Sequence, residues 1–222
     1  MGSLVNVVAG TAAFVGTHLA MSHPLRAPLV ARLGEKGFLG IYTLVSLATL
    51  FWMVQALKAI GPEPFVWAAS DWAWTAGAVM MLFASILLAG SIIGNPAMPG
   101  ATTAPDAKGV FAITRHPMMW GIALWALVHA IVWPQPSVLV LCTGIALLAL
   151  GGAAGQDAKK TKLQPDFWPA WRARTGFVPF TGPARARNWW PGWSVLAGGI
   201  ALWLAATWLH PLAGAPAVGF WR

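Results

Sequence analysis

Long apolar segments alternate along the chain with short stretches that are rich in proline, glycine or charged residues. Six of these segments are long enough, or nearly so, to cross the hydrocarbon core of a bilayer, which requires a helix of about 20 residues. They are Leu4–Met21, Phe38–Leu57, Trp72–Ile93, Met118–Trp133, Ser137–Gly155 and Trp193–Leu209. Prolines between them mark turns or helix ends. The pattern predicts an all-α, polytopic membrane helical bundle of about six transmembrane helices, which forms one domain over residues 1–222.

The composition agrees with a membrane location. Hydrophobic residues make up 58% of the chain and charged residues only 9%, whereas soluble domains carry about 25% charged residues. So few charges cannot cover a water-facing surface, and we expect an integral membrane protein whose main partner is the lipid bilayer. The net charge of +8 does not indicate nucleic-acid binding, because the cations cluster in particular loops rather than along one face.

The distribution of lysine and arginine predicts the orientation of the bundle. The first loop carries Arg26, Arg32 and Lys36, and the third carries Lys108 and Arg115. The fifth loop carries seven cations between positions 159 and 187, whereas the second has one at its edge and the fourth has none. Because cytoplasmic loops are enriched in lysine and arginine, we expect the odd-numbered loops in the cytoplasm and both termini outside.

The longest polar stretch, residues 156–190, also carries aromatic side chains. Phe167, Trp168 and Trp171 alternate there with basic residues, a pattern that can indicate binding to single-stranded RNA. Beside a bilayer we interpret it as a segment that lies at the membrane interface.

Candidate chemistry is concentrated between Thr114 and His129, where a basic turn leads directly into an apolar segment that contains a histidine. An imidazole within the hydrocarbon needs a partner, and an arginine at its edge needs an anion or water. His18 lies in the same way inside the first apolar segment. Two neutral imidazoles on different helices of a bundle are what bis-histidine haem b ligation requires. We therefore expect His18 and His129 to ligate a haem iron, with Arg115, Arg26 or Lys36 as the partner of its propionates.

Other assignments of the histidines remain open. His23 and His116 form a second candidate pair at the cytoplasmic edge, with His116 as a further cofactor contact, although both precede a proline at a helix end. The depths of the first pair differ, because His18 lies about 12 Å from Arg26 along a helix and His129 about 20 Å from Arg115. His210 is expected to be a solvated residue at the outer interface. No carboxylate lies deep in an apolar segment to complete a zinc or di-iron site.

Three stretches resemble signatures of the NnrU family. They are Gly16–His18 with Ser22–Arg26 and Arg32–Phe38, then Ile113–Pro117 with Trp120-Gly121, Trp125 and His129, and finally Gly155–Asp157 with Val178–Phe180. The resemblance implies a multi-pass protein of the bacterial inner membrane with a role in denitrification and nitric oxide metabolism. The plant relative of this family, 15-cis-zeta-carotene isomerase, is a haem b enzyme whose ligating histidines match His18 and His129. The cysteine that switches ligands in that enzyme corresponds to Ala126.

A second resemblance leaves the function open. Arg115-His116-Pro117 is similar to a motif of isoprenylcysteine-type membrane methyltransferases, which use S-adenosylmethionine, but Met119 replaces an aromatic residue and Gln156-Asp157 replace paired glutamates. Three classes therefore compete. The first is a haem protein that acts as a redox sensor or as an isomerase on a hydrophobic small molecule, with a membrane redox partner. The others are a methyltransferase and a non-catalytic assembly partner of a reductase.

Overall fold

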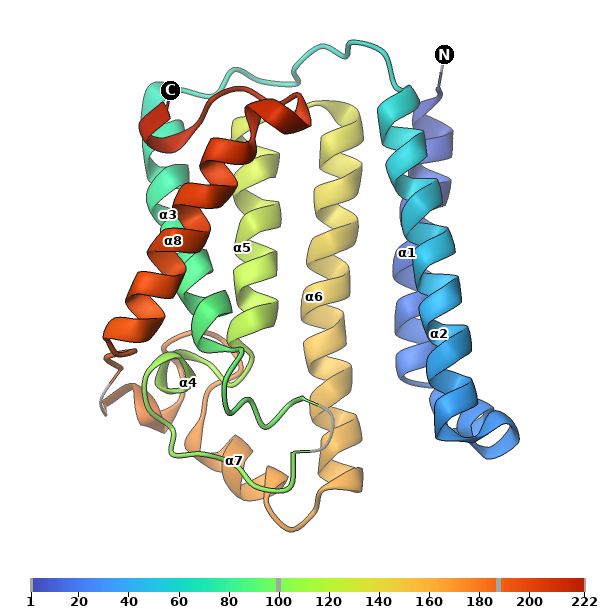
Figure 1. The fold of residues 1–222 in the computed structure, drawn as a ribbon, viewed down its shortest axis with the longest axis vertical. Coiled ribbons are helices and arrows are strands. Elements are labelled where there is room, and N and C mark those ends of the chain that lie inside the picture. Colours follow the sequence, from blue (N-terminus) through green and yellow to red (C-terminus); the bar gives the residue numbers. More distant parts are fainter. Residues whose placement is uncertain (1, 99–100, 187–188, 222) are drawn as a thin grey trace.

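The structure is a computed structural model, and it describes residues 2–98, 101–186 and 189–221. Within these residues it contains helices and no strand. Figure 1 shows the long helices side by side, with both chain ends at one end of the bundle. The long helices are α1 (Leu4–Ser22), α2 (Arg26–Ala59), α3 (Asp71–Gly90), α5 (Pro117–Val132), α6 (Pro136–Leu163) and α8 (Trp193–Leu209). The short elements are α4 (Val110–Ile113), α7 (Trp168–Arg174), η1 (Pro183–Ala186), η2 (Pro211–Ala213) and η3 (Gly219–Trp221).

The all-α membrane bundle predicted from hydropathy is confirmed. Among the described residues, α1, α2, α3 and α6 are long and apolar enough to cross a membrane, and α5 and α8 are shorter apolar helices. The 16 residues of α5 extend about 24 Å, somewhat less than a hydrocarbon core of about 30 Å. The end of the bundle that carries α4 and α7 (Figure 1) is the end that the charge distribution predicts to be cytoplasmic, and we call it the cytoplasmic end; both termini lie at the opposite end.

Two helices extend beyond their apolar segments, so two predicted boundaries were wrong. Helix α2 begins at Arg26 rather than Phe38, and α6 continues to Leu163 rather than ending at Gly155. The three cations placed in the first loop, Arg26, Arg32 and Lys36, therefore lie on α2. Hydropathy detects only the part of a helix that lies within lipid, and lysine and arginine are good helix formers in water. Of the cations predicted in the fifth loop, Arg187 lies outside the described residues.

Helix α2 is interrupted near its cytoplasmic end by Gly34, whose φ of 69° is outside the helical region. Glycine adopts this conformation without a steric cost because it has no Cβ. The kink allows Arg26 to form an exposed ion pair with Glu35.

Helix α6 occupies the middle of the bundle. It packs against α1 on one side and α5 on the other, while α2 packs against α1, and α3 packs against both α5 and α8. Figure 1 shows the α1–α2 pair and the α3–α8 pair on opposite sides of α5 and α6. Close contacts depend on glycine, as is usual for helices in lipid: a Cβ at Gly121 of α5 would lie 2.9 Å from the carbonyl oxygen of Ala84 on α3.

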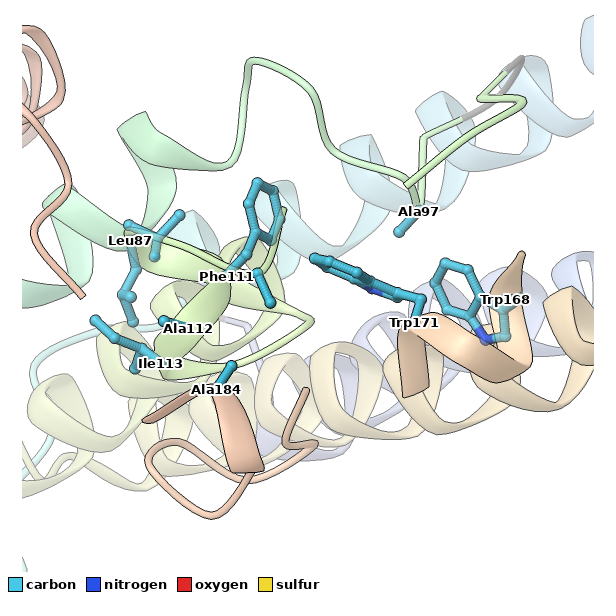
Figure 2. Packing of buried hydrophobic residues seen from close by; sticks show 10 residues of the cluster. Leu87, Ala97, Phe111, Ala112, Ile113, Trp168, Trp171 and Ala184 are labelled. Atoms are coloured by element: carbon cyan, nitrogen blue, oxygen red, sulfur yellow. The ribbon is translucent and has the colours of Figure 1, made fainter. Parts of the chain in front are cut away.

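A compact layer covers the cytoplasmic end, and its core is aromatic. Trp168 and Trp171 of α7 are fully buried and belong to one cluster with residues of α3, α4 and η1. Figure 2 shows Trp171 beside Phe111, and their ring centroids are 5.7 Å apart. These two tryptophans therefore contact protein rather than lipid headgroups, and the interfacial location of the segment stays a prediction. Their alternation with basic residues reflects one apolar side and one charged side of α7, and the apolar side faces protein.

The contact at Gly121 gives a first prediction. Gly121→Leu should destabilise the fold by about 1–3 kcal/mol, because the backbone of α3 cannot move aside without loss of packing. The protein has one cysteine, Cys142, and its side chain is buried in α6. Its reaction with a fluorogenic maleimide during heating therefore reports unfolding, and the transition should occur several degrees lower in the variant. Gly40→Leu is the control, because a Cβ at Gly40 meets no atom within 4 Å; equal transitions in both variants would contradict the packing model.

Candidate functional site

The Thr114–Pro117 motif forms a buried polar cluster with α6 and with the segment after α7. The guanidinium of Arg115 donates to both carboxylate oxygens of Asp157, with Nε 3.1 Å from Oδ1 and Nη2 2.5 Å from Oδ2. Its Nη1 donates to the carbonyl oxygen of Thr175 at 3.0 Å, and its backbone N–H donates to Gly176 at 2.9 Å. Arg115 and Asp157 are 7% and 6% exposed, so this bidentate ion pair is shielded from water.

His116 completes the cluster. Its Nε2 lies 2.9 Å from Oδ1 of Asp157, and because a carboxylate accepts, Nε2 carries the proton. Its Nδ1 is buried and has no hydrogen-bond partner among the described residues, and its ring packs against Phe177 and Trp168. The anion expected at Arg115 is therefore Asp157 of the chain itself, a partner that the sequence analysis did not identify.

A first cavity lies near the cytoplasmic end between α1, α2, α5 and α6, and we call it the inner cavity. Its volume is about 380 Å³, and His18, Ser22, His23, Tyr42, Gln156 and Lys159 are its polar lining residues. The ring of His18 donates from Nδ1 to the carbonyl oxygen of Phe14 at 2.8 Å. Since a carbonyl can only accept, Nδ1 carries the proton, and Nε2 of the neutral ring keeps its lone pair.

A second cavity lies at the opposite end between α3, α5, α6 and α8, and we call it the outer cavity. Its volume is about 590 Å³, and its lining includes Trp74, Trp125, His129, Trp133 and His210. His129 and His210 each donate from Nδ1 to the carbonyl four residues earlier, at 2.8 and 2.6 Å. Their rings are nearly parallel, with an interplanar angle of 17° and centroids 6.1 Å apart.

The structure places the predicted site residues in three separate regions. His18 lines the inner cavity and His129 the outer cavity, so this pair is not brought together. The alternative pair is also separate, because His23 lines the inner cavity while His116 belongs to the buried cluster. Arg26 pairs with Glu35 and Arg115 with Asp157, and neither arginine lines either cavity. Within the described residues, no group of three or more His, Cys, Asp or Glu side chains is arranged to hold a metal ion.

The structure instead pairs His129 with His210, which the sequence analysis assigned to solvent. Their positions gave some indication of this pairing. His129 lies near the outer end of α5, and His210 directly follows the outer end of α8. Their depths therefore agree better than those of His18 and His129. The sequence does not reveal that α8 lies close enough to α5 for the two rings to meet.

The buried cluster gives a second prediction. Asp157→Asn should destabilise the protein by about 3–5 kcal/mol, because it leaves the Arg115 guanidinium buried without a counter-charge. The heating assay with the Cys142 maleimide reaction measures the loss. Asp106→Asn is a matched control, since Asp106 forms an ion pair with Lys108 that is exposed on both sides and contributes less than about 1 kcal/mol. An unchanged unfolding transition in Asp157→Asn would show that the cluster does not hold the cytoplasmic layer to α6.

Comparison with known proteins agrees with the resemblance in the sequence. Residues 6–217 match the family model described as NnrU protein. No curated protein and no solved structure matches the sequence. The family match includes both cavities and the buried Arg115–Asp157 cluster almost in full. Because it covers nearly the whole chain, this protein belongs to the NnrU family.

Proposed function

We propose that this NnrU-family protein binds haem b in the outer cavity, where His129 and His210 would hold its iron. The observation that carries the proposal is the pair of nearly parallel imidazoles that α5 and α8 present to one cavity. Sequence analysis predicted His18 and His129 as the ligands. The proposal keeps His129 and replaces its partner, because His18 lines a different cavity.

The chemistry of both rings suits ligation of iron. Each Nδ1–H is held by a backbone carbonyl of its own helix, which is the arrangement that fixes the tautomer and orientation of metal-ligating histidines. In its neutral form, each ring therefore presents Nε2 with an available lone pair. Both rings line one cavity, with centroids 6.1 Å apart, so the two residues that would hold the iron are close to each other.

The surroundings of the two rings suit a large planar cofactor. The cavity of about 590 Å³ is within the range of about 300–1,000 Å³ for ligand sites. Trp74, Trp125, Trp133 and Trp203 supply aromatic walls, which exclude water and contact flat apolar groups well. No lysine or arginine of the described chain lines this cavity, so the proposal assigns no protein cation to the propionates.

The ligand set also indicates the kind of function. A bound haem supplies a one-electron redox couple, and two histidine ligands leave no open position on its iron. Such a centre suits electron transfer or a sensor that must release one ligand before it binds another molecule. This agrees with the proposed role of the family in nitric oxide and nitrite reduction. Ala126 is buried one turn before His129, so the ligand switch that a cysteine at this position provides in the plant isomerase is not available here.

The buried cluster does not favour the methyltransferase alternative. Arg115 and His116 are 7% and 2% exposed and contact Asp157. A soluble cofactor would have to displace this ion pair before it reached the motif. The geometry therefore favours a structural role for the motif.

The absorption spectrum tests the haem proposal. The protein, expressed with ample haem and purified in detergent, should show the Soret band and the reduced α and β bands of six-coordinate low-spin haem b. His129→Ala and His210→Ala should each reduce haem occupancy several-fold and convert the remainder to a five-coordinate high-spin form. His18→Ala and His23→Ala are matched controls that should keep the wild-type spectrum. Absence of a Soret band would contradict haem binding. Loss of the spectrum in His18→Ala but not in His210→Ala would instead favour the ligand pair predicted from sequence.

A further inference from the structure

We propose that the inner cavity binds an anionic amphiphile, an apolar chain that ends in a carboxylate or phosphate. In this arrangement the apolar chain lies among α1, α5 and α6, and the acidic head lies beside Lys159 at the cytoplasmic end. This site is separate from the proposed haem site, because the two cavities share no lining residue.

The mouth of the cavity carries a cation that is weakly engaged. The ammonium group of Lys159 has one hydrogen bond within the described residues, a long one of 3.5 Å to the carbonyl oxygen of Ser22. Arg26 and Glu35 act electrostatically on Lys159, and these two residues pair with each other. The mouth therefore has a surplus of one positive charge. An acidic head would supply the hydrogen-bond acceptors that Lys159 lacks.

The neighbouring histidine does not add to this charge at neutral pH. Burial and the positive charge of Lys159 lower the pKa of His23 below its usual value of 6.5, so its ring is neutral there. His23 packs closely against α6, since a Cβ at Gly155 would lie 2.5 Å from its ring. The ring therefore forms a wall of the mouth, and Lys159 remains the group that recognises an anion.

Deeper in the cavity the walls become apolar, except for one pair of polar side chains, His18 and Tyr42. Phe14, Met119, Ile122, Ile145 and Leu148 line the part within the membrane. His18 and Tyr42 lie together there, with ring centroids 5.5 Å apart in an edge-on arrangement. An apolar body beneath a cationic mouth is complementary to an amphiphile whose polar end is acidic. The volume of about 380 Å³ is at the lower end of the range for ligand sites, which favours a single chain.

A glycine at the cavity wall allows the site to be filled selectively. Gly152 lines the inner cavity, and a Cβ there meets no atom within 4 Å. Gly152→Leu therefore adds a side chain to the cavity without a clash. Gly16→Leu is its matched control, because a Cβ at Gly16 also meets nothing within 4 Å and this exposed glycine does not line the cavity.

The experiment uses the full chain in phosphatidylcholine nanodiscs and a diazirine-bearing palmitic acid as the probe. Wild type and Gly16→Leu should be labelled on residues of the inner cavity, and an excess of palmitate should prevent the labelling. Gly152→Leu should be labelled at least fivefold less. If Gly152→Leu lowers the Cys142 unfolding temperature, Leu148→Trp replaces it as the blocking variant. Equal labelling of a correctly folded blocking variant and of wild type would overturn the proposal.

The charge of the head is tested in the same assay. Lys159→Gln should weaken apparent probe affinity about tenfold, whereas Lys162→Gln, an equal charge change on the same helix away from the cavity, should change it less than twofold. Equal effects of these two variants, or equal competition by palmitate and uncharged hexadecanol, would overturn anion recognition.

Nanodiscs with added phosphatidylglycerol then distinguish which molecule supplies the acidic head. Loss of labelling would identify a lipid phosphate, and unchanged labelling a free carboxylate. The haem spectrum of Gly152→Leu should match wild type, so failure here is distinguishable from failure of the haem proposal.

Discussion

The ion pair between Arg115 and Asp157 connects three parts of the chain at one buried point. Arg115 precedes α5, Asp157 lies on α6, and the same guanidinium also holds the carbonyl oxygen of Thr175 after α7. Each group is buried, so each depends on the other to remain charged away from water. This connection adds to the packing of α5 against α6 and helps to hold the segment after α7, and with it the aromatic layer around Trp171, against the bundle. Both cavities lie between helices whose spacing this connection helps to set.

The sequence predicted the number and type of helices well because the bilayer imposes a simple rule. A helix within lipid must be apolar over about 20 residues, and α8 begins and ends exactly where its apolar segment does. The rule says nothing about the part of a helix that continues from the bilayer into water. For that reason the cytoplasmic ends of α2 and α6 were assigned to loops, although Arg26–Lys36 and Gln156–Leu163 lie within these helices.

The site was harder to predict because residue type does not reveal which helices are neighbours. His18 and His129 were paired as the most deeply placed imidazoles, and their different depths already indicated a mismatch. Helix α1 packs against α2 and α6, whereas α8 packs against α3, which also packs against α5. His129 on α5 therefore lies near His210 at the end of α8, while His18 on α1 lines the other cavity. Similarly, Arg115 was correctly recognised as a group that needs an anion, but sequence spacing could not show that Asp157 supplies it 42 positions later.

The two cavities are separate but share the same two central helices. On α5, Met119 and Ile122 face the inner cavity, whereas Trp125 and His129 face the outer one. Because Trp125 follows Ile122 by three positions, less than one helical turn divides the two sites along α5. A tilt or shift of α5 that widens one cavity must move side chains of the other. If both sites are occupied, their binding free energies are therefore coupled, and the coupling is equal in both directions. Under the two proposals, an acid bound in the inner cavity would in this way alter binding in the outer cavity without contacting it.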